Sequence, residues 1–264
     1  MTPFAFHRPA SVASAVQLRS AQADASYLAG GQSLLPAMKL GLTAPSDLID
    51  LSLLSGAVGI TLDGGSLRIG AMTPHAVVGA SPEVGKHIPA LACLASGIGD
   101  PAVRTRGTLG GSLANNDPAA CWPAAVLGLG ATVHTDRRQI AADHFFKGLY
   151  QTALQPGELI AAVSFAVPKR AAYVKFKQPA SRFALVGVFV SDGPQGVRVA
   201  VTGAGPGVFR ATALEAALAR SFTAQALDGI KLPGDDLNSD LHGSAAYRAH
   251  LIGVLARRAV AQAA

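Results

Sequence analysis

Two glycine pairs in closely similar surroundings constrain this chain more than any other feature of its sequence. They lie in Ala29-Gly30-Gly31-Gln32-Ser33 and in Thr108-Leu109-Gly110-Gly111-Ser112, and each pair is followed closely by a hydroxyl residue. Because glycine has no Cβ, its backbone adopts a positive φ easily and can approach a ligand closely. Consecutive N–H groups in such a loop, with the dipole of a following helix, form an anion-binding concavity. Two such loops would suit a diphosphate, although two ordinary Gly-Gly turns agree equally well with the spacing.

The first glycine pair falls within a predicted α/β unit. Ser11 is a suitable N-cap for a helix over 11–22, and a short strand is expected at 25–28, directly before the glycine pair. A short helix over 33–40 and a strand over 47–51 follow. This order of elements places the glycine loop at the end of a strand, where α/β proteins commonly bind ligands.

The second glycine pair is predicted to lie in a loop over 104–113. Before it, alternating apolar residues on each side of Asp63-Gly64-Gly65 predict a hairpin over 58–70. After it, Asp117 is expected to be the N-cap, and Pro118 the first residue, of a helix that ends near residue 129. The other elements expected in this region are helices near 74–80 and 89–97, and a hairpin formed by 131–135 and 139–142.

A shift in composition near Pro168 predicts a second, smaller domain of about 95 residues. Apolar runs with strand character occupy 173–177, 185–191 and 197–202. Helical patterns follow at 212–220 and 244–263, and the second of these is long and rich in alanine. We therefore expect three strands followed by helices after the boundary.

Composition excludes several classes of protein. Half of the residues are apolar and 14% are charged, which excludes a disordered chain. The two cysteines are too few for an iron–sulfur cluster or a four-cysteine zinc site, so we expect no metal in this chain. The net charge of +6 comes from scattered basic pairs, so nucleic-acid binding is not expected. Without a membrane span or a signal-peptide pattern, we expect a cytoplasmic protein.

Standard nucleotide-binding and hydrolase signatures are absent, but five sequence blocks, taken in order, resemble a known protein family. No GxGxxG, complete Walker A or GxSxG sequence occurs. The two specific blocks are AGGQSLLPAMKL (29–40) and RGTLGGSLANNDPAACWPAA (106–125), and three further blocks lie at 145–160, 175–188 and 235–260. Together they resemble the FAD-binding medium subunit of the molybdenum hydroxylases, the family of aerobic carbon monoxide dehydrogenase and xanthine dehydrogenase.

The resemblance implies an α+β fold with two domains. Residues 1–169 would form the FAD-binding domain, with a small parallel α/β subdomain and a second subdomain of mixed or antiparallel sheet with helices. Residues 170–264 would form the C-terminal domain, with a three-stranded antiparallel sheet and helices. The strands and helices predicted above agree with both.

The resemblance also implies which residues touch FAD. Those around the first glycine pair would hold the diphosphate from one side, namely Ala29, Gly30, Gly31, Gln32, Ser33 and Leu34. Those around the second pair would hold it from the other, namely Thr108, Leu109, Gly110, Gly111 and Ser112. Further contacts implied are Asn115 and Asp117 on the adenosine–ribityl side, Ile98 and Ile160 along the flavin, and Lys177 near the isoalloxazine.

Some of these positions have simpler structural explanations or depart from the family pattern. From pattern alone, Ile98 and Ile160 would be assigned to the core, and Lys177 to the surface. Gln32 stands where many members carry histidine. Cys121 stands where they often carry an aspartate near the ribose, so that hydrogen bond is in doubt.

The function implied is electron transfer within a heterotrimer. Substrate would be hydroxylated at a molybdopterin cofactor on a large partner subunit, and electrons would pass through two [2Fe–2S] clusters on a small partner subunit to FAD and then to an external acceptor. A dimer of such heterotrimers is expected, and no side chain of this chain is expected to be a catalytic acid or base. The alternatives are a free-standing flavin oxidase or dehydrogenase with its own substrate site, and a phosphate-ligand binding or assembly module.

Overall fold

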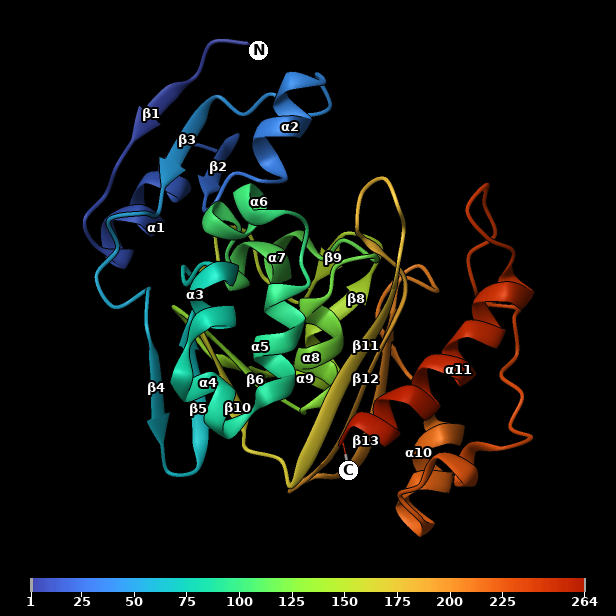
Figure 1. Cartoon of the computed structure of the whole chain (residues 1–264). Helices are drawn as coiled ribbons and strands as arrows, with labels where there is room; N and C mark the ends of the chain where they lie inside the picture. The colour runs from blue at the N-terminus through green and yellow to red at the C-terminus, as the bar shows by residue number, and fades with distance from the viewer. Residues whose placement is uncertain (1, 264) are drawn as a thin grey trace.

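A small parallel sheet forms the N-terminal part of the protein, in a computed structural model that describes residues 2–263 (Figure 1). Its strand order is β1-β3-β2, and both pairs are parallel. Its elements are β1 (Ala5–His7), α1 (Val12–Ala21), β2 (Ala25–Leu28), α2 (Leu34–Lys39) and β3 (Asp47–Asp50). Ser11 caps α1 by accepting from the Ser14 N–H. The predicted α/β unit is therefore present, with the first glycine pair between β2 and α2.

A five-stranded antiparallel sheet forms the second part. Its strand order is β4-β5-β10-β6-β7, so β10 lies at the centre. Its strands are β4 (Ile60–Asp63), β5 (Ser66–Gly70), β6 (Thr132–Thr135), β7 (Gln139–Ala141) and β10 (Ile160–Ala166). Both predicted hairpins are present, as β4–β5 and β6–β7.

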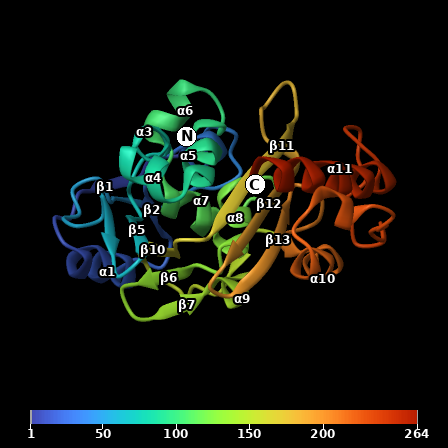
Figure 2. The same cartoon turned by 60° about the horizontal axis from the view of Figure 1, so that its bottom comes forward.

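Short helices cover one face of this sheet, as Figures 1 and 2 both show. They are α3 (His75–Ala80), α4 (Pro82–His87), α5 (Pro89–Ser96), α6 (Pro101–Arg106), α7 (Leu109–Asn115) and α8 (Trp122–Gly128). The core between sheet and helices contains the fully buried rings of Trp122, Phe145 and Phe165. Along the edge follow α9 (Ala142–Phe145), β8 (Phe146–Gly148) and β9 (Gln151–Thr152).

The second glycine pair lies in a helix, so the prediction of a loop over 104–113 is wrong. Gly110 and Gly111 belong to the first turn of α7, and Thr108 is its N-cap. A separate helix, α6, ends at Arg106. Because glycine is a poor helix former, the sequence alone favours a loop here. Tertiary contacts, described below, outweigh that preference.

The helix predicted from Asp117 starts later than expected, because α8 begins at Trp122 with Cys121 as its N-cap. Asp117 accepts instead from the Ala119 N–H, which closes a turn. The hydroxyl of Thr202 donates to the carbonyls of Pro118 and Ala120. These bonds to the C-terminal sheet hold 118–120 outside the helix.

A second antiparallel sheet begins at Arg170. Its order is β11-β12-β13-β14, and its strands are β11 (Arg170–Lys177), β12 (Ala184–Gly193), β13 (Gly196–Thr202) and β14 (Phe209–Arg210). The three predicted strands are present, and β14 is an addition. The helices α10 (Thr212–Arg220) and α11 (Ala245–Ala263) pack on one face of the sheet, with the 3-10 helix η1 (Ala224–Leu227) between them in sequence.

The other face of this sheet packs against α5 and α8, so the sheet lies between two layers of helices (Figure 1). Gly128 in α8 allows this approach, because a Cβ there would lie 2.8 Å from the Phe189 ring. The buried Arg198 side chain donates to the Leu127 carbonyl at 2.8 Å and pairs with Asp143.

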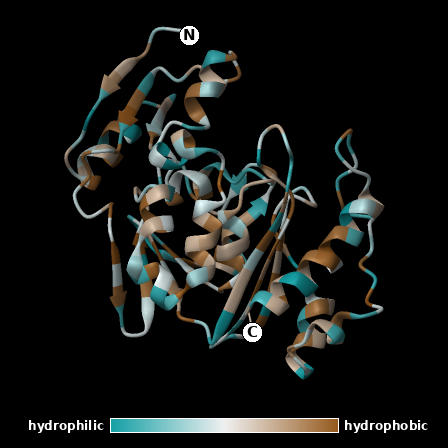
Figure 3. Ribbon diagram, in the orientation of Figure 1, coloured by the Kyte–Doolittle hydropathy of each residue, from teal (hydrophilic) through white to brown (hydrophobic). Residues whose placement is uncertain are grey.

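Apolar residues concentrate in the central helices and strands (Figure 3). Within the described residues, no helix combines the length and apolar character needed to cross a bilayer.

Candidate functional site

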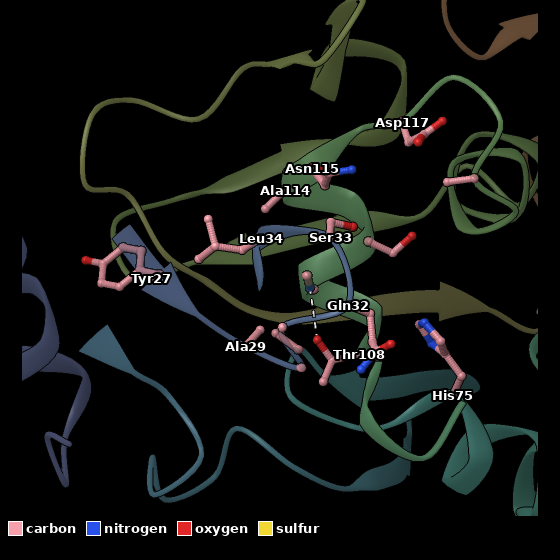
Figure 4. A pocket seen from close by; sticks show the side chains of 18 of the residues that line it. Tyr27, Ala29, Gln32, Ser33, Leu34, His75, Thr108, Ala114, Asn115 and Asp117 are labelled. Carbon is pink, nitrogen blue, oxygen red and sulfur yellow. Dashed lines mark hydrogen bonds between the residues drawn. The ribbon is translucent and has the colours of Figure 1, made fainter. Parts of the chain in front are cut away.

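A cavity of about 610 Å³ lies where the N-terminal α/β unit, α7 and the β11–β12 hairpin meet (Figure 4). This volume is within the range of about 300–1,000 Å³ that is usual for ligand pockets. Both glycine segments line it. The predicted site residues on its wall are Ala29, Gly30, Gly31, Gln32, Ser33, Leu34, Ile98, Thr108, Gly110, Gly111, Ser112, Asn115, Asp117 and Ile160.

The two glycine segments are in contact with each other. A Cβ at Gly30 would lie 1.9 Å from the carbonyl oxygen of Arg106, so only glycine lets the two backbones approach this closely. A Cβ at Gly111 would lie 3.3 Å from the Ala29 Cβ and 2.9 Å from Thr108 Oγ1. Segments far apart in the sequence therefore form one continuous wall of the cavity.

The first glycine segment offers unpaired backbone donors. Gly31 has a φ of +72°, which turns the chain between β2 and α2. The N–H groups of Gly31, Gln32 and Ser33 make no hydrogen bond within residues 2–263. Since successive free N–H groups bind anions, this segment fits the predicted diphosphate cradle.

The second glycine segment contributes space and hydroxyl groups rather than free N–H donors. The Gly110 N–H donates to the Ala71 carbonyl at 2.7 Å, and the Gly111 N–H donates to Thr108 Oγ1 at 3.1 Å (Figure 4). The Ser112 N–H donates to the Thr108 carbonyl at 3.1 Å. The prediction that both glycine segments form an anion-binding concavity of free N–H groups is therefore wrong, because only the first segment has such groups. The Thr108 and Ser112 hydroxyls remain for a ligand on this side.

Lys177 does not line the cavity, although it was expected beside the flavin. It is exposed, whereas Lys175 on the same strand lines the cavity. A shift in the pairing of β11 with β12 between Phe176 and Lys177 interrupts the alternation of the strand there. The Lys175 ammonium donates to the carbonyls of Gly97 at 2.9 Å and Arg182 at 3.0 Å. Of the two lysines, it is therefore Lys175 that brings a positive charge to the cavity wall, which Arg19 and Arg182 also line.

Cys121, which departs from the family pattern, is buried in the cavity wall. Its Sγ lies 3.3 Å from Lys175 Nζ. A thiol is a weaker hydrogen-bond partner than a carboxylate. This position therefore contributes a thiol contact to Lys175 in place of the carboxylate that the resemblance implies.

Several residues of the site carry no sequence signal that identifies them. Glu158 lines the cavity, and its carboxylate accepts from Arg138, Thr135 and the Gln155 N–H, which lower its pKa to about 2. Tyr27 donates to the Gly157 carbonyl at 3.0 Å, and burial raises its pKa to about 12. These contacts hold the 155–160 loop against the N-terminal unit and so shape one wall of the cavity.

His75 also lines the cavity and escapes prediction from sequence. It is buried, and its Nδ1 accepts a hydrogen bond of 3.0 Å from Trp122 Nε1. Burial, with a smaller effect of the Arg104 charge, lowers its pKa to about 4. The imidazole is therefore neutral near pH 7.

Comparison with known families identifies the family to which the chain belongs. Residues 2–169 match the family described as "FAD binding domain in molybdopterin dehydrogenase", and residues 171–263 match "CO dehydrogenase flavoprotein C-terminal domain". The chain belongs to the FAD-binding medium subunits of the molybdenum hydroxylases. The resemblance recognised from the five sequence blocks, the α+β fold and the FAD cofactor are thereby confirmed.

Relatives of this family match the chain over nearly its full length. It is 37% identical to the nicotine 6-hydroxylase medium subunit of Paenarthrobacter nicotinovorans, over 97% of this chain and 95% of that one. It is 35% identical to the carbon monoxide dehydrogenase medium chain of Afipia carboxidovorans, over 98% and 96%. A solved structure of reconstituted CO dehydrogenase from Oligotropha carboxidovorans superposes with a TM-score of 0.90 at 34% identity, covering 99% of this chain and 98% of that one.

The residues on the cavity wall fit FAD. Free N–H groups at Gly31–Ser33 and the hydroxyls of Thr108 and Ser112 are suited to a diphosphate. Ile98 and Ile160 provide apolar wall for a planar ring system, and Ile160 is buried at the start of β10. Donors, hydroxyls and apolar side chains thus occur together in one cavity of suitable size.

Proposed function

We propose that this chain carries FAD as the electron-transfer subunit of a heterotrimeric molybdenum hydroxylase or dehydrogenase. In this proposal a large partner subunit holds the molybdopterin cofactor and oxidises the substrate. A small partner subunit with [2Fe–2S] clusters delivers electrons to this chain, and an external acceptor removes them. The observation that supports FAD binding is the cavity that the two contacting glycine segments line together. The chain has only two cysteines, which bears on the iron–sulfur clusters. Such clusters need about four cysteine ligands each, so a partner must supply them.

The residues of the cavity divide the work of binding. The N–H groups of Gly31, Gln32 and Ser33 would neutralise the diphosphate, and the hydroxyls of Thr108 and Ser112 would complete its hydrogen bonds. Asn115, the last residue of α7, and Asp117, two residues beyond it, would hold the adenosine–ribityl part. When bound, FAD supplies the redox chemistry. The protein holds it, shields it from water and sets the charge around it.

The assembly and domain boundaries belong to the same proposal. The related proteins are named medium subunits or medium chains, which supports large and small partners. We propose in addition that two such heterotrimers form a dimer. We place the FAD-binding domain at residues 1–169 and the C-terminal domain at residues 170–264, and we place the complex in the cytoplasm.

Purification of the whole complex tests this function. We expect the tagged chain to co-purify with a molybdopterin-binding chain and a cysteine-rich small chain. Adding the substrate of the complex without an acceptor should then bleach the visible flavin absorbance. Removal of the small subunit should stop this reduction while leaving FAD bound. A chain that purifies alone and whose flavin is reduced directly by a small substrate would instead support the free-standing oxidase.

Lys175 should set the redox potential of the bound flavin. A fixed positive charge in the cavity wall favours an anionic reduced form, so Lys175→Met is expected to lower the potential. We expect a shift of about 30 mV or more, which is about 1.4 kcal/mol for a two-electron couple. Lys177→Met is the matched control, because its side chain is exposed and should change the potential less. Spectroelectrochemistry of both variants measures the flavin potential. A larger shift in Lys177→Met than in Lys175→Met would show that Lys177, not Lys175, sets the potential.

A further inference from the structure

His75 occupies a rigid position on the wall of the cavity. It is the first residue of α3, and its backbone N–H donates to the Gly107 carbonyl at 2.9 Å. The preceding Pro74 forms a bridge with Thr108, the N-cap of α7. The residue is 4% exposed, and its side chain projects toward the cavity beside Gln32 and Thr108 (Figure 4). The backbone and its neighbours therefore fix where this imidazole lies.

The contact with Trp122 selects one tautomer of the ring. An indole nitrogen only donates, so the His75 Nδ1 that lies 3.0 Å from Trp122 Nε1 must be the acceptor. The proton of the neutral imidazole is then on Nε2. Trp122 is completely buried, and its indole has no other partner within residues 2–263. The low pKa of His75 agrees with this neutral, Nε2-protonated form.

The Nε2–H has no acceptor in the described part of the chain. Gly107 leaves room beside it, because a Cβ at Gly107 would lie 2.8 Å from Nε2. The nearby Arg104 is itself a donor and is bonded to the carbonyls of Ile98 and Gly99. Three other side-chain polar atoms without a partner are fully buried, namely Asn116 Oδ1, Tyr173 Oη and Arg198 Nε, and His75 Nε2 is not among them. A buried ring thus presents an unused donor to the cavity.

We propose that His75 donates its Nε2–H to a diphosphate oxygen of the FAD held in this cavity, with Trp122 as the residue that fixes its tautomer. This inference rests on the proposed position of FAD in the cavity. The diphosphate is the part of FAD expected here, because His75 lies against both segments that would hold it: Gly107 is next to both Gly30 and His75 Nε2, and Thr108 pairs with Pro74. His75 adds a neutral donor on the side where the second glycine segment lacks free N–H groups.

Two substitutions of His75 separate a bond to FAD from a structural role. His75→Asn keeps an acceptor near the Nδ1 position for Trp122 but lacks a donor at the Nε2 position. His75→Gln can place an amide donor near the Nε2 position. We expect His75→Asn to weaken FAD affinity about tenfold or more, and His75→Gln to stay within about threefold of the wild type. Fluorescence titration of the full-length apoprotein with FAD measures both affinities.

Equal losses in the two variants, or no loss in either, would overturn the proposal. Fluorescence of Trp122, the only tryptophan of the chain, reports whether each variant keeps the native core. Nitrogen NMR of the wild type gives a measurement that needs no variant: the His75 ring should be protonated at Nε2, and that proton should shift and exchange more slowly when FAD binds. The phosphorus resonances of bound FAD should also differ between wild type and His75→Asn, and unchanged resonances would count against a diphosphate contact.

Failure of the FAD position gives a different pattern from failure of the His75 contact. If FAD does not lie in this cavity, Gly111→Val will leave FAD affinity unchanged. If Gly111→Val abolishes binding while His75→Asn and His75→Gln behave alike, only the His75 inference is wrong.

Discussion

Gly111→Val is expected to abolish retention of FAD by the purified protein. The Cβ of any residue here would lie 2.9 Å from Thr108 Oγ1 and 3.3 Å from the Ala29 Cβ, and the valine methyl groups extend further. They would separate the two glycine segments and disturb the cap of α7, where the Gly111 N–H donates to Thr108 Oγ1. Overpacking of this kind costs about 1–3 kcal/mol. Because this cost falls on the FAD-binding conformation, FAD affinity should fall by about 5- to 150-fold, since about 1.4 kcal/mol is tenfold.

The visible flavin absorbance per protein chain, measured after gel filtration, gives the result directly. Gly85→Val is the matched control, because Gly85 also lies in a short helix but a Cβ there would meet nothing within 4 Å. We expect the control to keep its flavin. A Gly111→Val protein with full flavin absorbance would show that the second glycine segment does not contact the cofactor.

The elements that the sequence predicts well are those with local signals. The serine cap at Ser11 starts α1, and the turn residues Asp63-Gly64-Gly65 join β4 to β5. The first glycine segment also follows its strand as expected, with Gly31 at a positive φ. In these places the hydrogen-bond partners or turn residues are a few positions away in the chain, so the sequence contains the information needed.

Elements that depend on distant partners could not be predicted in the same way. The second glycine pair becomes helical because Ala71 and Thr108 bind its N–H groups and the absence of Cβ atoms admits Ala71 beside Gly110. Asp117 fails to start a helix because Thr202, from the other domain, binds the carbonyls that follow it. Propensity is a weak guide where such contacts decide.

The same limit applies to the site. Fourteen of the predicted contacts line one cavity, but Leu109 is buried in the core instead, and the lysine on the wall is Lys175 rather than Lys177. A bulge between strands determines which lysine reaches the cavity, and pairing register is not visible in the residues themselves. The hydrogen bond between Trp122 and His75 joins residues far apart in the sequence, and neither residue type alone predicts it.

Glu158→Gln is expected to destabilise the protein strongly and in a pH-dependent way. The carboxylate is fully buried and accepts from Arg138 Nε and Nη2, both at 2.9 Å, as well as from Thr135 and the Gln155 N–H. Glutamine removes the charge, so Arg138 loses its ion pair and keeps only hydrogen bonds to neutral groups such as the Ala153 carbonyl. Because the Arg138 side chain is 41% exposed, solvent reduces the cost, and we expect a loss of about 2–3 kcal/mol in the free energy of unfolding near pH 7.

The pH dependence follows from the direction of the pKa shift. The pKa of Glu158 falls from 4.5 to about 2 on folding, so the unfolded chain binds this proton more tightly than the folded one. The stabilisation is therefore complete above about pH 4.5 and disappears as the pH falls toward 2. The difference in unfolding free energy between wild type and Glu158→Gln should be constant from pH 7 to about 5 and shrink at lower pH.

Urea unfolding of the FAD-free proteins at several pH values measures this difference without a contribution from ligand binding. Glu83→Gln is the control, since the Glu83 side chain is 45% exposed and, within residues 2–263, its one ion pair is with His87 on the same helix. Exposed pairs of this kind contribute about 0–1 kcal/mol, so the control should change stability little at any pH. If Glu158→Gln behaves like this control, the carboxylate does not hold the 155–160 segment in place. The position of this segment in the cavity wall would then depend on the hydrogen bond from Tyr27 to the Gly157 carbonyl.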